Sequence, residues 1–298
     1  MTEFWQLCFA GLALGARYAL VALGFVIIYR ATGVINFAQG GLLAVGAYLA
    51  YAFANQASLP FVVAVLLALL VAGLLGAGVE RVVLRRTVGQ PVFAVIMITI
   101  GLLFILEQVV TAVWGFDALN LADPWGVDTL ETGGIVFAER DLWTIGIAAA
   151  VLGGFFAFFR FSSLGVAMRA TAIDPEAALA QGISARRVHG VSWAIAAGLA
   201  ALAGVTLASG PAALNPGIGA IALVAFPAMI VGGLDSPLGA VLGGIIIGLT
   251  QALTGGYQDD IAPWLGENFS QVMPYVVMIL ILLVRPYGLF GTQEVRRV

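Results

Sequence analysis

The chain has 298 residues, of which 61% are hydrophobic and only 10% are charged. This composition leaves far too little polar surface to coat a water-soluble globule, so lipid must be its main solvent. The net charge of −3 says little, because the side of the membrane on which charges lie matters more than their sum. A single cysteine, Cys8, excludes an intrachain disulfide and a thiol cluster for a metal, so no metal site is expected.

Apolar segments of spanning length occupy most of the chain. A helix needs about 20 apolar residues to cross a hydrocarbon core of about 30 Å, because lipid cannot satisfy an exposed backbone. Six runs meet this standard: residues 7–29, 34–54, 60–79, 92–114, 142–159 and 188–209. Three less regular runs follow at residues 219–234, 237–253 and 271–284, and one of them is a candidate for a short, broken or re-entrant segment. We therefore predict an all-α polytopic bundle of eight or nine spans, forming one transmembrane domain over residues 1–298.

Charged residues alternate between the two sides of this predicted bundle. All 13 basic residues are arginine. Eleven fall in four places: Arg30; Arg81, Arg85 and Arg86; Arg160, Arg169, Arg186 and Arg187; and Arg285, Arg296 and Arg297. Acidic residues fill intervening loops: Asp117, Asp123, Asp128, Glu131, Glu139 and Asp141 in one, and Asp259, Asp260 and Glu267 in another. The excess of arginine predicts cytoplasmic connections, so we expect a multi-pass protein of a bacterial inner membrane with its C-terminus inside and acidic loops in the periplasm.

The longest arginine-rich connection, at about residues 160–187, leaves the membrane for about one helix and its flanks. Asp174 is placed as an N-cap, Pro175 fits the first helical position, and Glu176 lies in the first turn, where the helix dipole favours an acid. Gly182 supplies a stop. These signals predict a short helix over about 175–181 with a small, mostly apolar docking surface: Ala177, Ala178 and Leu179. The alternative is an amphipathic connector between two spans.

This loop resembles that of the permease subunits of ABC importers. Glu176, Ala177, Ala178 and Gly182 match their E-A-A-x-x-x-G pattern, although the I-x-L-P tail of the fullest motif is missing after Gly182. The resemblance implies a coupling helix that sits in a cleft of an ATPase subunit.

Further stretches resemble the branched-chain amino acid permease family of ABC importers, specifically its LivH-type subunit. They are GLALGARYALVALGF at 11–25, NFAQGG at 36–41, Arg169 with Asp174 in the loop, and GGLDSPLGA at 232–240. The resemblance implies a heterodimer with a second, LivM-like permease, two cytoplasmic ABC ATPases that use ATP and Mg²⁺, and a periplasmic amino-acid-binding protein. No cofactor bound by this chain and no nucleic-acid partner are expected. Close relatives handle urea or short amides, so a permease for these substrates stays open as an alternative.

Polar residues inside apolar segments are candidates for the substrate pathway, because they are costly unless they face protein or water. Asn36, Gln39, Gly40 and Gly41 interrupt the predicted span over 34–54. Glycines permit local unwinding, which would leave backbone groups to contact a zwitterion. The alternative is tight helix packing, with the two amides bonding across helices.

Three further polar residues lie at membrane depth: Arg17, Glu107 and Gln108. We favour structural pairing of Arg17 and Glu107, with each other or with backbone, over a role in holding substrate. Glu107 and Gln108 are nevertheless kept as pathway candidates.

Two groups of small residues and prolines predict local backbone features in the later spans. Pro211, Asn215 to Gly217 and Pro227 break the helical pattern after residue 209, which predicts an irregular segment at the periplasmic mouth or inside the pore. The second group forms a helix-packing surface: Gly239, Gly243, Gly244 and Gly248.

Other function classes receive little support. The chain has no lysine, so it cannot carry the G-x-x-x-x-G-K-[ST] phosphate loop, and energy from ATP would have to come from a partner. An ion-coupled secondary transporter would need interior carboxylates, and Glu107 is the sole interior acid. No His pair, H-E-x-x-H or Cys-His pattern suggests an intramembrane enzyme. We therefore predict a non-enzymatic permease subunit.

Overall fold

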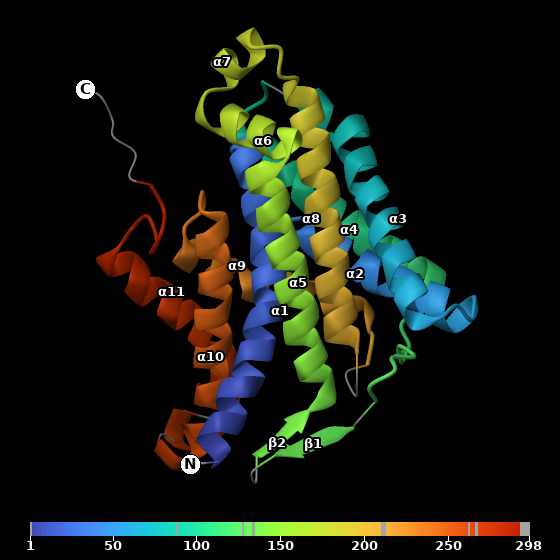
Figure 1. Cartoon of the computed structure of the whole chain (residues 1–298), viewed down its shortest axis with the longest axis vertical. Helices are drawn as coiled ribbons and strands as arrows, with labels where there is room; N and C mark the ends of the chain where they lie inside the picture. The colour runs from blue at the N-terminus through green and yellow to red at the C-terminus, as the bar shows by residue number, and fades with distance from the viewer. Residues whose placement is uncertain are drawn as a thin grey trace.

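The computed structural model describes residues 2–87, 89–126, 128–132, 135–209, 213–261, 263–265 and 268–292 (Figure 1). Pro211, Glu267, Arg296 and Arg297, which entered the predictions above, lie outside these described residues.

Helices dominate the described chain. Long helices alternate with shorter ones: α1 (Thr2–Thr32), α2 (Gln39–Tyr51), α3 (Phe61–Val82), α4 (Val92–Trp114), α5 (Glu139–Phe161), α6 (Ser163–Ile173), α7 (Pro175–Ala180), α8 (Ala185–Ala208), α9 (Ile221–Gly232), α10 (Pro237–Ile261) and α11 (Met273–Val284). Short 3₁₀ and π turns flank them: η1 (Ala52–Gln56), η2 (Leu84–Thr87), η3 (Pro216–Ala220), η4 (Pro263–Leu265) and η5 (Phe269–Gln271). A hairpin of β1 (Thr129–Thr132) and β2 (Ile135–Ala138) interrupts the acidic loop before α5.

Six of the described helices are long and apolar enough to cross a membrane: α1, α3 with η2, α4, α5, α8 and α10. The helices α2, α9 and α11 have 13, 12 and 12 residues. At 1.5 Å per residue each is about 18–20 Å long, which is less than the hydrocarbon thickness of about 30 Å. The prediction of an all-α, multi-pass bundle is confirmed. The predicted count of eight or nine spans is not confirmed, because six described helices are long enough to cross a membrane.

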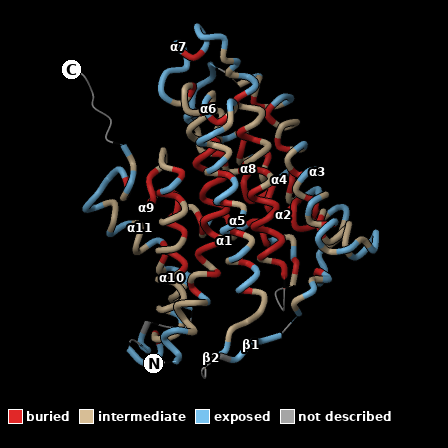
Figure 2. Tube along the Cα trace, viewed as in Figure 1, coloured by how far each residue is buried: buried red, intermediate tan, exposed pale blue. Residues whose placement is uncertain are grey.

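Small residues let α1 lie at the centre of the bundle. Figure 2 shows buried residues concentrated along α1, α2, α8 and α9. A Cβ added at Gly244 of α10 would lie 2.5 Å from the backbone nitrogen of Ala19, and Gly248 of the same helix packs directly on Gly15. Gly239 and Gly243 meet the backbone of α9 at Gly232 and Ala228. The predicted helix-packing surface on α10 is therefore confirmed, and it faces both α1 and α9.

The two ends of the molecule differ in the elements that form them (Figure 1) and in the charged residues that these elements carry. We call one the arginine-rich end: it contains α7 and the helix termini that carry Arg30, Arg85 and Arg187. The opposite end, the acidic end, contains the N-terminus and the β1–β2 hairpin. Apolar side chains such as Leu70 of α3 are exposed along the sides between these ends, as expected for a surface that meets lipid.

Candidate translocation site and coupling loop

The short helix α7 forms at the arginine-rich end with the local structure that the sequence predicts. The Asp174 carboxylate accepts hydrogen bonds from the backbone N–H groups of Glu176 (3.0 Å) and Ala177 (2.9 Å). Pro175 occupies the first turn, and Gly182 follows the helix with φ of +80°, a conformation that favours glycine. The predicted cap, helix and stop are confirmed.

The loop is larger than one helix, and one residue of its predicted docking surface faces inward. A second helix, α6, precedes α7. Ser162 caps α6, because its hydroxyl oxygen accepts a hydrogen bond from the N–H of Gly165 (2.9 Å). Ala178 is 5% exposed, so it packs against the protein, whereas Leu179 is 62% exposed. Arg169 is also turned inward: it donates to the carbonyl of Arg160 (3.3 Å). Of the predicted docking surface, Ala177 and Leu179 are exposed, and Glu176 is exposed beside them.

The segment before α2 is not helical, so the predicted span over 34–54 begins later than expected. Residues 33–38 form no helix, and Asn36 precedes α2 instead of interrupting it. The Phe37 N–H donates to Thr99 Oγ1 (3.2 Å), and Gln39 Nε2 donates to the carbonyl of Ala196 (3.2 Å). Thr99 lies about 10 Å along α4 from Val92 and Ala196 about 16 Å along α8 from Ala185, at about 1.5 Å per residue. The chain thus returns from the arginine-rich end to mid-bundle as irregular backbone.

Asn36 holds this irregular backbone in place. Its side-chain oxygen accepts from the Ala38 N–H (3.0 Å), and its amide nitrogen donates to Gln39 Oε1 (3.5 Å). Both amide side chains are buried, at 1% and 0% exposed. Asn36 and Gln39 therefore satisfy polar groups that an interrupted helix would leave without partners in an apolar surrounding.

A second interrupted segment reaches mid-bundle from the acidic end. Residues 213–215 are irregular, Leu214 forms an isolated β-bridge with Leu119, and η3 leads into α9. Pro216 therefore occupies the first position of a 3₁₀ turn, as expected for an irregular segment, but Pro227 lies inside α9 without ending it.

The two interrupted segments meet at Gly40 and Gly219. A Cβ on Gly40 would lie 2.5 Å from the Gly219 carbonyl oxygen, and a Cβ on Gly219 would lie 2.8 Å from the Gly40 carbonyl oxygen and 3.1 Å from Glu107 Oε1. We call this contact, with Asn36 and Gln39, the polar junction.

The other predicted pathway residues are Gly41 of α2 and Glu107 and Gln108 of α4, and only some belong to the junction. Gly41 packs against Leu106, where an added Cβ would lie 2.8 Å from the Leu106 Cβ. Gln108 is exposed on the outer side of α4, away from the junction. Thr99 and Gly219 are contacts that the sequence reasoning missed, because a threonine and a glycine are common in apolar helices and carry no signal of their own.

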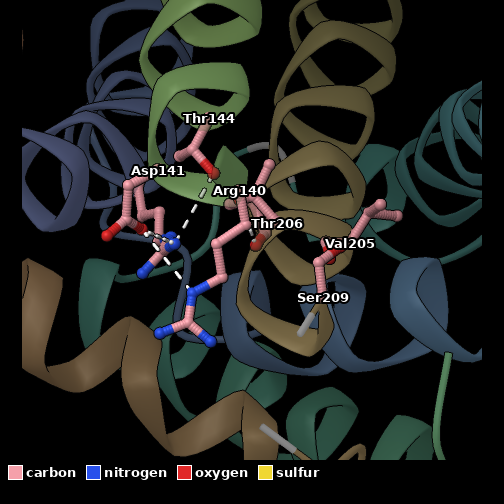
Figure 3. A network of polar contacts seen from close by, with 8 residues as sticks. Arg140, Asp141, Thr144, Val205, Thr206 and Ser209 are labelled. Atoms are coloured by element: carbon pink, nitrogen blue, oxygen red, sulfur yellow. Dashed lines mark hydrogen bonds and ion pairs between the residues drawn. The ribbon is translucent and has the colours of Figure 1, made fainter. Parts of the chain in front are cut away.

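Arg17 pairs with Asp141 and not with Glu107. Figure 3 shows Asp141 with its neighbours Arg140 and Thr144. Arg17 Nη2 lies 2.9 Å from Asp141 Oδ1 and donates to Thr144 Oγ1 (3.5 Å). Arg140 Nε lies 3.9 Å from the same Asp141 oxygen. The interpretation of Arg17 as structurally paired is confirmed, but its partner is Asp141, which was assigned to a loop. Helix α5 begins at Glu139, so Asp141 lies in its first turn and faces α1.

A cavity of about 1140 Å³ connects the arginine-rich end with the polar junction. Ile173 and Pro175 of the loop that carries α6 and α7 line one part of it, and Asn36 and Thr99 line another. We call it the inner cavity. Polypeptide of irregular structure is tolerated at membrane depth where it lines such a cavity, which explains the non-helical backbone at residues 33–38. Among the described residues, no group of three His, Cys, Asp or Glu side chains could hold a metal ion.

Comparisons with known proteins agree with this architecture. The family model described as "Branched-chain amino acid transport system / permease component" matches residues 7–282. The high-affinity branched-chain amino acid transport system permease protein LivH of Escherichia coli (strain K12) is 31% identical, covering 99% of this chain and 98% of that protein. The corresponding protein BraD of Pseudomonas aeruginosa is 32% identical, covering 97% and 96%.

A solved structure, PsaBC from Streptococcus pneumoniae in complex with Fab, has a similar fold. Its TM-score is 0.50 at 16% sequence identity, covering 93% of this chain and 91% of that chain. Because the family model and the relatives cover nearly the whole sequence, the chain belongs to the family of branched-chain amino acid transport system permease components.

Proposed function

We propose that this chain is the membrane-spanning permease subunit of an ATP-driven ABC importer for leucine, isoleucine and valine. The observation that carries the proposal is the inner cavity, which runs from the capped helix α7 to a polar junction between two interrupted helices. Membership of the branched-chain amino acid permease family supports the substrate class.

The proposed orientation places the arginine-rich end in the cytoplasm of a bacterium and the acidic end in the periplasm. Following the chain from α1 to α11 gives nine passages between the ends if α2, η3–α9 and α11 are counted as short ones. The N-terminus is then periplasmic, which agrees with its place opposite α7 in Figure 1. The interruptions of α2 and α9 account for the shortfall in the length of these two helices.

In the proposed complex, a second related permease, two cytoplasmic ATPases and a periplasmic amino-acid-binding protein complete the transporter. The ATPases supply the nucleotide site, and ATP and Mg²⁺ bind there. Glu176, Ala177 and Leu179 present the exposed face of α7 to an ATPase, while Asp174 and Gly182 fix the ends of that helix.

We propose alternating access at the polar junction. Residues of the arginine-rich end line the cavity, and Asn36 lines it beside the polar junction. We assign this arrangement to an inward-facing state in which the contact of Gly40 with Gly219 closes the route toward the acidic end. Closure of the ATPases would move α7 and α6, whose Thr171 and Ile173 line the cavity. This movement would separate the junction and narrow the cavity. Asn36, Gln39 and Glu107 would then offer polar groups to the zwitterion.

The test is ATP-dependent uptake of radiolabelled leucine into proteoliposomes that contain the chain with its co-purifying partners and the binding protein. We expect Glu176→Arg to abolish uptake and to release the ATPases during purification. Ser163→Arg is the control, because it adds a positive charge to an exposed residue of α6 outside the matched motif. Uptake that persists without ATPases, or that follows an ion gradient, would contradict the proposal. Uptake of urea but not leucine would keep the architecture and change the substrate.

A further inference from the structure

Arg30 is a half-buried cation on the wall of the inner cavity. It lies in the last turn of α1, and its guanidinium stacks over the Phe159 ring, 5.7 Å from the ring centroid. Among the described residues, no carboxylate oxygen lies within 4.0 Å of its guanidinium nitrogens. A cation at a helix C-terminus is favoured by the dipole, which explains why it is tolerated there but not why it lacks a counter-ion.

The two carboxylates that line the cavity, those of Glu80 and Asp235, already accept hydrogen bonds. Glu80 accepts from Arg85 Nη2 (2.8 Å) and Arg85 Nε (3.4 Å). Asp235 accepts from the Thr292 hydroxyl and from the Thr292 N–H, at 3.2 Å to each carboxylate oxygen. Within the part of the chain that the structure describes, Arg30 is thus the charged group of the lining that has room for an added anion.

The surroundings of Arg30 favour an anion that also carries a positive charge. The Arg169 guanidinium lies 5.4 Å from the centroid of the same Phe159 ring, so two cations lie near one aromatic ring and repel each other. Asp235 lines the same cavity as Arg30, and no ion pair within 4.0 Å joins these two described residues. A carboxylate at Arg30 would offset the repulsion, and an ammonium on the same molecule would find Asp235 nearby.

Apolar side chains supply the remainder of the lining next to these charges. Those close in sequence to Arg30, or at the start of α4 and the end of α5, are Ile28, Ile35, Val92, Val95 and Phe156. Pockets for small ligands typically enclose about 300–1,000 Å³ and combine an apolar wall with a few polar groups. At about 1140 Å³ the inner cavity is larger than such pockets, so one amino acid would occupy part of its wall instead of filling it.

We propose that the inner cavity contains a binding site for an aliphatic α-amino acid, with the carboxylate on Arg30, the ammonium toward Asp235 and the side chain against the apolar lining. This inference rests on the proposed function and deepens it, because it assigns a site on the cytoplasmic side of the polar junction. The site is open to the cytoplasm, so it senses the transported product there. Its occupancy holds the inward-facing state and slows import as the product accumulates.

The site is tested by direct binding, without the binding protein and without nucleotide. The complete transporter in lipid nanodiscs is titrated with radiolabelled leucine, and unlabelled leucinol, which lacks the carboxylate, and 4-methylpentanoate, which lacks the ammonium, are used as competitors. We expect leucine to bind and both competitors to be at least about tenfold weaker, the loss that corresponds to one charge-assisted hydrogen bond. Arg30→Gln should weaken leucine binding by a similar factor, and Arg30→Lys less.

Arg81→Gln is the matched control. Arg81 is exposed in the last turn of α3, at the arginine-rich end, and lies outside the cavity lining. Leucine binding that is unchanged in Arg30→Gln, or leucinol that competes as well as leucine, would overturn the site. If Arg30→Gln does not fold, the competition by leucinol in the wild type still tests whether the site requires the carboxylate. Absence of leucine binding while ATP-driven uptake is intact would overturn this inference alone. Loss of ATP-driven uptake itself would instead refute the proposed function.

Discussion

The backbone of Gly40, at the start of α2, lies against Gly219 of η3, so that a Cβ on Gly40 would be 2.5 Å from the Gly219 carbonyl oxygen. These residues are far apart in sequence: Gly40 lies in the first turn of α2, and Gly219 lies in η3, which leads into α9. Their contact lies next to Asn36, which lines the inner cavity, and the proposed mechanism takes it as the closure toward the acidic end. Substitutions at this contact should therefore change the rate of transport more than they change the structure of the lipid-facing helices.

The substitution Gly40→Ala tests the closed junction. The added methyl group must displace backbone, which typically costs about 1–3 kcal/mol, and we expect a clear fall in the initial rate of ATP-dependent leucine uptake at equal protein content. Gly101→Ala on α4 is the control, because a Cβ there meets nothing within 4 Å. Uptake equal to that of Gly101→Ala would show that the contact does not take part in transport.

The Asp174 cap predicts that the charge of this residue is less important than its ability to accept hydrogen bonds. Removal of the acceptor in Asp174→Ala should destabilise α7 by about 1 kcal/mol, whereas Asp174→Asn keeps an N-cap side chain of nearly equal preference. We expect the ATPase activity stimulated by the binding protein to fall in the alanine variant and to remain close to wild type in the asparagine variant. Equal activity in the two variants would contradict a role for the cap in coupling.

The ion pair between Arg17 and Asp141 should contribute to stability at the acidic end. Their side chains are only 15% and 13% exposed, so removing one partner leaves a poorly solvated charge. We expect Asp141→Ala to lower the stability by about 1–3 kcal/mol, a value reduced from that of a fully buried pair, as measured by thermal unfolding in detergent. A double variant Arg17→Met with Asp141→Leu should recover part of the loss, and Arg140→Gln should change little.

The close packing of α10 on α1 predicts that a larger residue at a contacting glycine lowers the stability of the protein. Gly244→Ala places a Cβ 2.5 Å from the backbone nitrogen of Ala19, so the two helices must separate. We expect a loss of about 1–3 kcal/mol in stability and a lower yield of folded protein. Gly153→Ala on α5 meets nothing within 4 Å and should be neutral or slightly stabilising, because alanine favours a helix over glycine by about 1 kcal/mol. A similar unfolding temperature for both variants would refute the close approach.

Local signals in the sequence were reliable where a few neighbouring residues decide the structure. The cap at Asp174 and the stop at Gly182 depend on backbone groups within one turn, so both were predicted correctly. Predictions were wrong where the position of a residue depends on contacts with residues distant in the sequence. Ala178 was expected at the surface but is buried, because α6 and the rest of the loop bring it against the protein.

The polar junction could be predicted in part. Asn36, Gln39 and Gly40 were identified because polar and small residues in an apolar segment are costly without a reason. Their partners Thr99, Ala196 and Gly219 could not be, since they come from three other segments of the chain and two of them contribute only backbone. Gln108 shares the polarity of these residues but lies on an exposed face of α4, which periodicity alone did not reveal.

Composition and the spacing of apolar runs determined by themselves that this protein is a helical bundle in a membrane, because lipid leaves few other ways to satisfy the backbone. The distribution of arginine determined a preferred orientation as a prediction. Only the tertiary structure decided that Arg17 pairs with Asp141, that two helices begin at mid-bundle, and that Arg30 faces the inner cavity. These features depend on distances between residues remote in sequence, and such distances follow from the packing of whole helices.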